Sequence, residues 1–109
     1  MITPHATSLT ATPALIQLFP LQLHFPFLTA TLTATLTDTV TGLPVPGQII
    51  TFSTGGHFLG TAITDANGTA SLVEILSLPL IIINGGYDAT FAGTPTLQPS
   101  TVHAPFLAL

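Results

Sequence analysis

The chain has no lysine and no arginine, and its four acidic residues give it a formal net charge of −4 at pH 7. Binding to nucleic-acid phosphates or to anionic lipid requires cationic side chains. Phosphoryl-transfer sites also use lysine or arginine to hold the transferred charge. The missing cations therefore exclude nucleic acid as a partner, argue against kinase-like chemistry and rule out a Lys–Asn isopeptide crosslink.

Cysteine and tryptophan are also absent, and there is a single tyrosine. Without cysteine the chain has neither a disulfide framework nor a thiolate metal site, and its redox compartment stays undetermined. Charged residues make up 4% of the chain, against about 25% in typical soluble domains. Hydrophobic residues make up an ordinary 47%, so we expect a folded protein that is solvated by hydroxyl and amide side chains.

Long apolar runs are missing as well. The most apolar stretch, Ala14 to Leu28, is short of a membrane span and is broken by Pro20 and Pro26, so we expect no membrane insertion. The start, MITPHATSLTATP, lacks the basic region and single apolar block of a secretory signal. We expect an extracellular, cell-surface or virion location, reached either as part of a longer secreted chain or inside a virus particle.

Period-two alternation recurs in short runs bounded by glycine, proline, asparagine and aspartate, which predicts an all-β chain. Its 109 residues suit a single domain. Residues 1–27 are interpreted as an edge strand followed by a proline-broken extended segment, and residues 28–107 as the body. About seven short strands separated by turn signals predict an immunoglobulin-like antiparallel β-sandwich. The expected strands cover residues 7–12, 28–38, 48–54, 57–64, 69–75, 87–93 and 101–107.

The segment LTATLTATLTD, Leu28 to Asp38, alternates so regularly that we predict a central strand with two different faces. Ala30, Leu32, Ala34 and Leu36 should be buried, and the threonines between them should be exposed. An ice-binding surface needs a flat array of threonines on several neighbouring strands, and one dense strand does not provide it. Two tight hairpin turns are expected, at Gly55-Gly56 and within Asp65 to Gly68.

Three segments carry a resemblance to a known family: LTATLTDTVTGLPVPGQIITFST, LGTAITDANGTASL and NGGYDATFAGTPTLQPSTVHA. In this order they resemble the bacterial immunoglobulin-like (Big-type) repeat domains of secreted and cell-surface proteins, relatives of which occur in phage structural proteins. The resemblance implies stalks, adhesins, spacers or virion components, and it implies no catalytic residues. The family usually carries surface lysine and arginine, which this chain lacks.

The titratable side chains form no recognisable catalytic or metal motif. The histidines are His5, His24, His57 and His103, and the carboxylates are Asp38, Asp65, Glu74 and Asp88. No two histidines have the short spacing of a metal site, and no nucleophile motif is present, so we predict no metal, no cofactor and no enzymatic activity. Asp38 should close its strand.

Two places are predicted to have structural roles. Asp65, Asn67 and Gly68 should form a turn, because the segment lacks the other ligands of a calcium loop. The same residues include a formal glycosylation sequon, Asn67-Gly68-Thr69. Tyr87 should pack its ring inward and bind its hydroxyl to the backbone, as in a tyrosine corner.

These observations favour a non-enzymatic module for assembly, decoration or adhesion, which associates with itself or enters a larger assembly. The alternatives are a filament subunit that exchanges strands, with residues before about Thr29 as a removable donor arm, and a carbohydrate- or ligand-binding module. Sugar sites typically use exposed aromatics; Phe25, Phe27 and Phe58 are candidates, although core packing is favoured. The predicted interface residues are Leu15, Ile16, Leu18, Phe19, Leu21, Leu23, Phe25, Phe27, Leu78, Leu80, Ile81 and Ile82.

Overall fold

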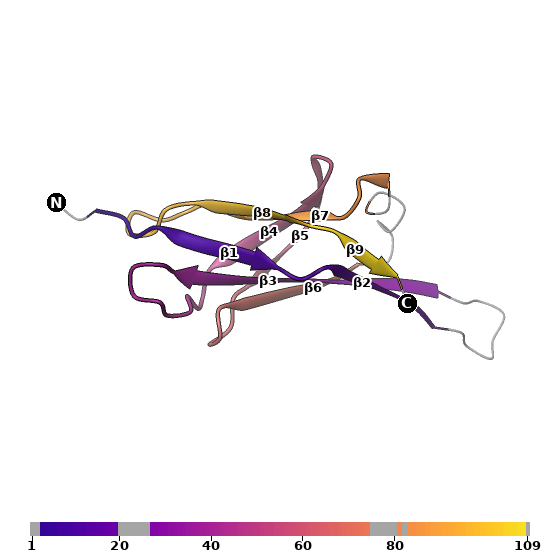
Figure 1. Ribbon diagram of the computed structural model, residues 1–109, viewed down its shortest axis with the longest axis horizontal. Coiled ribbons are helices and arrows are strands. Elements are labelled where there is room, and N and C mark those ends of the chain that lie inside the picture. The colour runs from indigo at the N-terminus through magenta and orange to yellow at the C-terminus, as the bar shows by residue number, and fades with distance from the viewer. Residues whose placement is uncertain (1–2, 20–26, 75–80, 82, 109) are drawn as a thin grey trace.

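A computed structural model of the chain describes residues 3–19, 27–74, 81 and 83–108 (Figure 1). These residues form nine β-strands. The backbone at Ile81 and Ile83 has helical geometry. The strands are β1 (Thr7–Ala11), β2 (Ala14–Phe19), β3 (Phe27–Asp38), β4 (Ile49–Thr54), β5 (His57–Ile63), β6 (Thr69–Glu74), β7 (Tyr87–Phe91), β8 (Ser100–Ala104) and β9 (Phe106–Ala108).

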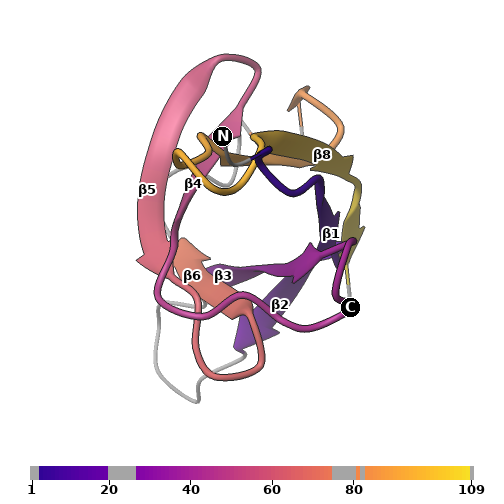
Figure 2. The same cartoon turned by 90° about the vertical axis from the view of Figure 1, so that its left-hand side faces the viewer.

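The strands form two sheets that face each other across the core, as Figure 2 shows end-on. One sheet has the order β5-β4-β7-β8, and the other contains β1, β2, β3, β6 and β9. β1 and β2 follow one edge of β3 in succession, because β1 pairs with residues 34–38 and β2 with residues 27–31. Pro13 separates these two strands and Pro105 separates β8 from β9, as proline cannot donate a ladder hydrogen bond. Counting each interrupted path once gives seven strands, which confirms the predicted sandwich.

β2 corrects one part of the prediction. A proline-broken extended segment was expected after the first edge strand, but Ala14–Phe19 form β2, which lies between β3 and β9. It pairs antiparallel with β3 over Leu15 to Phe19 and parallel with β9 over Ala14 to Ile16. β9 therefore covers the edge that β2 would otherwise expose. The pairing of β2 with β9 is the one parallel pairing among the described strands.

β3 is the central strand of its sheet, as predicted. It has β1 and β2 along one edge and β6 along the other. Ala30, Leu32, Ala34 and Leu36 are all buried, as predicted. The threonines that alternate with them on the outer face were expected to be exposed but are half-buried: Thr31, Thr33, Thr35 and Thr37. The alternation of apolar residues and threonine in the sequence therefore corresponds to the inner and outer faces of β3.

The two predicted turns have different outcomes. Gly55-Gly56 joins β4 to β5 as a two-residue hairpin, with positive φ at both glycines. The turn at Asp65 to Gly68 is equally tight, but β5 pairs with β4 and β6 pairs with β3. The predicted second hairpin is therefore wrong: this turn crosses from one sheet to the other.

The first part of the chain belongs to the sandwich. Leu9 of β1 and Ala14 of β2 are buried in the same core as Phe52 of β4 and Ala89 of β7. Removal of the residues before Thr29 would delete both strands on one edge of β3. The expectation that these residues can be removed with the fold intact is therefore wrong, because β1 and β2 complete the sheet.

Candidate functional site

Tyr87 links the two sheets at the interruption between β1 and β2. Its side chain is fully buried, and its ring lies 6.0 Å from that of Phe52. The hydroxyl donates to the carbonyl oxygen of Thr12 at 2.5 Å and accepts a hydrogen bond from the backbone N–H of Thr33 at 3.2 Å. The prediction of an inward ring with a backbone-bound hydroxyl is confirmed, but the partners lie on the opposite sheet.

This environment also changes the acidity of the phenol. Burial raises the pKa of Tyr87 above its ordinary value, and the hydrogen bonds with Thr33 and Thr12 oppose that shift only in part. The neutral hydroxyl is the form that the fold holds. Tyr87 is therefore a structural residue and has no open approach for a substrate.

The turn at Asp65 is built as predicted. The Asp65 carboxylate accepts hydrogen bonds from the backbone N–H groups of Asn67 at 2.8 Å and Thr69 at 3.0 Å. Gly68 has a φ of +74°, and a Cβ atom at that position would lie 2.5 Å from the carbonyl oxygen of Leu36. Turn chemistry occupies one oxygen of the carboxylate and fixes the chain where it crosses between sheets.

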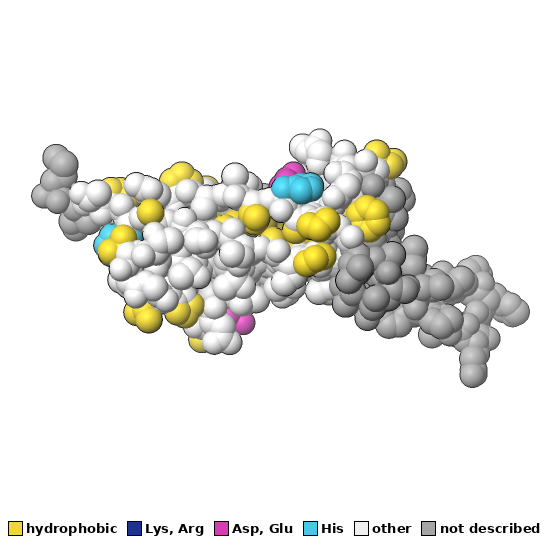
Figure 3. Space-filling model, viewed as in Figure 1, with side chains coloured by type: hydrophobic (Ala, Val, Ile, Leu, Met, Phe, Trp, Pro, Cys, Tyr) yellow, Lys and Arg dark blue, Asp and Glu magenta, His cyan; other side chains and the backbone are white. Residues whose placement is uncertain are grey.

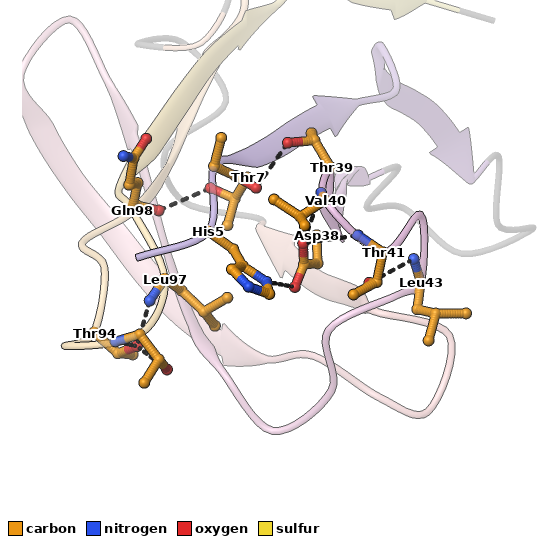
Figure 4. Close-up of polar contacts among 12 residues, drawn as sticks. His5, Thr7, Asp38, Thr39, Val40, Thr41, Leu43, Thr94, Leu97 and Gln98 are labelled. Carbon is orange, nitrogen blue, oxygen red and sulfur yellow. Dashed lines mark hydrogen bonds and ion pairs between the residues drawn. The ribbon is translucent and has the colours of Figure 1, made fainter. Parts of the chain in front are cut away.

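His5 and Asp38 form a clasp at one end of the sandwich (Figure 4). His5 Nδ1 lies 2.7 Å from Asp38 Oδ2. The other carboxylate oxygen accepts hydrogen bonds from the N–H groups of Val40 and Thr41. The hydrogen bond with His5 lowers the pKa of Asp38 below its ordinary value, reinforced by the two backbone donors and opposed by partial burial. Asp38 closes its strand, as predicted, and also binds the N-terminal segment.

The same end is fastened by backbone contacts. The N–H of His5 donates to the carbonyl of Thr96, and the N–H of Gln98 donates to the carbonyl of His5. Thr7 adds a side-chain hydrogen bond to the carbonyl of Gln98 at 2.8 Å (Figure 4). Residues 5–7 thus join the loop after β3 to the loop after β7.

A second pair lies on the outer face of the four-stranded sheet. His103 Nδ1 is 2.8 Å from Asp88 Oδ1, and both side chains are exposed to solvent. His57 is exposed to solvent, and His24 and the side chain of Glu74 lie outside the described residues. Within the described part of the chain, no three histidine, cysteine, aspartate or glutamate side chains could jointly hold a metal ion.

The predicted interface residues have mixed outcomes. Ile81 is fully buried in the chain's own core, so its assignment to an interface is wrong. The sequence pattern could not separate a core contact from a partner contact in an apolar run. Leu21, Leu23, Phe25, Leu78, Leu80 and Ile82 lie outside the described residues. Only the backbone is described for Leu15, Ile16, Leu18, Phe19 and Phe27.

The outer face of the four-stranded sheet carries a row of hydroxyls. Thr61, Thr51, Thr90 and Thr101 lie directly opposite one another across β5, β4, β7 and β8. The other sheet has a comparable row, in which Thr10, Thr35 and Thr69 are in register. The expectation of a single dense threonine strand is therefore wrong, because hydroxyls from neighbouring strands line up on both sheets.

Large hydrophobic side chains are exposed beside the first of these rows. Ile49 and Ile63 are directly opposite each other on β4 and β5, and they are 59% and 65% exposed. Phe58, for which core packing was favoured, is 63% exposed. Figure 3 shows one face of the molecule, on which acidic and histidine side chains are few and hydrophobic ones are scattered among uncharged atoms. Adjacent exposed apolar side chains, such as Ile49 and Ile63, are of more interest than single ones, because contiguous apolar patches mark binding surfaces.

Two open grooves lie where β4 and β7 separate and along β7 and β8. The first, of 330 Å³, is lined by Gln48, Ile49 and Thr51 on one side and by Phe91 and Ala92 on the other. The second, of 310 Å³, shares Phe91 and Ala92 and continues to Thr101. Neither groove is lined by a histidine or a carboxylate, so neither coincides with a titratable pair.

Sequence reasoning missed both His–Asp pairs and the exposed isoleucines. The pairs join residues 33 and 15 positions apart, which only strand register brings together. In IITFST, Ile49 and Ile50 look equivalent, but one faces solvent and the other is fully buried. Side chains alternate between the two faces of a strand, so Ile50 shares a face with Phe52, and Ile49 lies on the opposite face. This alternation was the signal that could have identified Ile49 as exposed.

Among the described residues, no helix is long and apolar enough to cross a membrane. A scan against protein-family models finds no match to the chain, and comparisons with curated proteins and with solved structures find none either.

Proposed function

We propose that the chain is a non-enzymatic structural module, displayed on a cell surface or a virion, that binds protein partners in assembly, decoration or adhesion. The observation that carries this proposal is the outer face of the four-stranded sheet, which has few charged groups and on which Ile49 and Ile63 are exposed side by side. Such a face is suited to contact with another protein surface, because little desolvation of charge opposes it. Asp88 is its one carboxylate, and it already has His103 as a partner.

The bacterial immunoglobulin-like family is part of the same proposal. The two-sheet sandwich supports it, and so does the interlocking of two of the motifs on which the resemblance rests. Thr64, from the TDANG segment, donates its hydroxyl to the carbonyl of Val45 in the GLPVPG loop at 2.8 Å. β1 begins toward one end of the long axis and β9 ends toward the other, an arrangement that suits linkage of such modules in series (Figure 1).

Chemistry at the surface supports a binding role over a catalytic one. The two His–Asp pairs stabilise the end of β3 and the outer face, and the grooves are lined by uncharged residues. Among the described aromatic side chains, Phe58 is the one that is more than half exposed. A single ring is a poor platform for sugars, so carbohydrate binding has less support.

Multi-angle light scattering of the purified protein over a wide concentration range tests this proposal, with electron micrographs to distinguish filaments or shells from particles. We expect the mass to rise above that of the monomer as concentration increases. A monomer at every concentration that also binds no surface protein of its source would contradict it.

A further inference from the structure

β5 forms an open edge of the four-stranded sheet. It pairs with β4 on one side and with no other described strand. At its end, the N–H of Thr64 donates to the carbonyl of Gln48, and the carbonyl of Thr64 accepts from Gly47. Residues of an antiparallel strand direct their backbone groups to alternate sides. Thr61 and Ile63 therefore point their N–H and C=O groups away from β4.

These outward groups have no partner strand in the described chain. No backbone hydrogen bond joins Thr61 or Ile63 to β6, which belongs to the other sheet. Natural sheet edges are usually blocked by lysine, proline, inward charges or bulges. β5 has no acidic, basic or proline residue apart from His57, and its bulge lies between the Phe52 and Ser53 pairings. The stretch from Gly60 to Ile63 keeps regular register and is left open.

We propose that this edge of β5 pairs antiparallel with the same edge of a second copy, which joins two four-stranded sheets into one continuous sheet. The inference rests on the proposed function and names its partner. With Ala62 on the two-fold axis, Thr61 of each copy is opposite Ile63 of the second copy. Those two residues then exchange both backbone hydrogen bonds, as outward-facing positions in such a ladder do.

Side chains and charge favour a second copy as the occupant. The pairing sets the exposed Ile63 beside the second copy's strand, and Ile49 lies next to it on the same face. The nearest carboxylate is Asp65, which its own turn occupies. In this register the two Asp65 residues are separated by about six strand residues, or about 20 Å. That distance exceeds the Debye length of about 8 Å at physiological salt, so repulsion between them is screened.

Sedimentation velocity of the full chain and three single variants tests the inference. Ile63→Lys and Thr61→Lys each place a cation on the proposed edge, and Thr101→Lys places one on the same face at the opposite edge. The two β5 variants should weaken dimerisation on the order of 100-fold, because like charges would meet across the two-fold axis. Thr101→Lys should dimerise like the original chain. Circular dichroism checks that each variant is folded.

The outcomes separate this inference from the proposed function. Association that persists in both folded β5 variants overturns edge pairing and leaves an assembly role in place. Equal loss in all three variants also overturns it, because the sheet face would then be the contact. An original chain that stays monomeric at the highest concentration overturns edge pairing together with self-association.

Discussion

At the scale of single residues, Tyr87 compensates for an interruption in the sheet. Pro13 separates β1 from β2, and opposite Thr33 the ladder on that edge of β3 is only half formed. The N–H of Thr12 donates to the Thr33 carbonyl at 3.0 Å, but the N–H of Thr33 has no carbonyl partner among the described residues on that edge. A buried backbone N–H without a partner costs free energy comparable to a lost hydrogen bond. The Tyr87 hydroxyl reaches across the core and accepts that N–H. The interruption and the tyrosine therefore form one structural unit.

Replacement of Tyr87 by phenylalanine keeps the ring but removes this bridge. We expect the free energy of unfolding to fall by about 1–3 kcal/mol, because the carbonyl of Thr12 and the N–H of Thr33 each lose the Tyr87 hydroxyl as a partner. Urea denaturation followed by circular dichroism measures the change. An unchanged midpoint would mean that water replaces the hydroxyl without cost.

Tyr87 also predicts how stability depends on alkaline pH. Its pKa is raised in the folded state, so its contribution is complete below the unfolded value of about 10 and is lost as pH rises through the folded value. The chain has no lysine, arginine or cysteine, so no other side chain titrates there. Thermal unfolding between about pH 9 and pH 12 should show a falling Tm, with tyrosinate absorbance rising on unfolding. Tyr87→Phe should remove this dependence of Tm on pH. A fall in Tm that persists in the variant would mean that another group causes it.

Asp38 determines how stability depends on acidic pH. Its pKa is lowered in the folded state, chiefly by the hydrogen bond with His5, so its contribution is present above the unfolded value of about 3.9. That contribution is lost as pH falls through the lower folded value. Asp38→Asn should lower the Tm at neutral pH and converge with the original chain in strong acid. Thermal scans from neutral to acidic pH test this, with His5→Gln as the matched variant; parallel curves would contradict it.

At the scale of elements, the sequence predicted strands more completely than their partners. Alternation in Leu28 to Asp38 determines both faces of β3, and Gly55-Gly56 determines the β4–β5 hairpin. Local turn chemistry at Asp65 to Gly68 does not say whether the next strand stays in the same sheet, so the crossing was missed. The parallel pairing of β2 with β9 joins residues about ninety positions apart and has no local signal.

Gly68 tests the importance of the crossing turn. In Gly68→Ala the positive φ would be strained, and the new methyl group would meet the Leu36 carbonyl. We expect a loss of about 1–3 kcal/mol or more. Gly42→Ala is the matched control, because its φ of +76° is similar but nothing lies within 4 Å of the added Cβ. Its smaller loss would report backbone strain alone; equal losses measured by chemical denaturation would show that the close contact is unimportant.

At the scale of the whole molecule, the sequence predicted a hydroxyl-solvated surface but not where a partner binds. Composition alone indicates that threonine replaces charge. The rows of threonines depend on the register of neighbouring strands, which no single strand encodes. Apolar runs were interpreted as interface, and Ile81 proved to be core. The exposure of Ile49 and Ile63 was not predicted, because the outward-facing residues of β4 and β5 are similar in type to the inward-facing ones.

Hydrogen exchange at the amides of Thr61 and Ile63 tests self-association through β5 most directly. These amides face away from β4, so they should exchange rapidly in dilute protein and become protected as concentration rises. The amide of Thr64, which donates to the carbonyl of Gln48 next to β4, should be protected at every concentration. Equal exchange at Thr61 and Ile63 in dilute and concentrated samples, under conditions where light scattering detects association, would contradict the proposed contact.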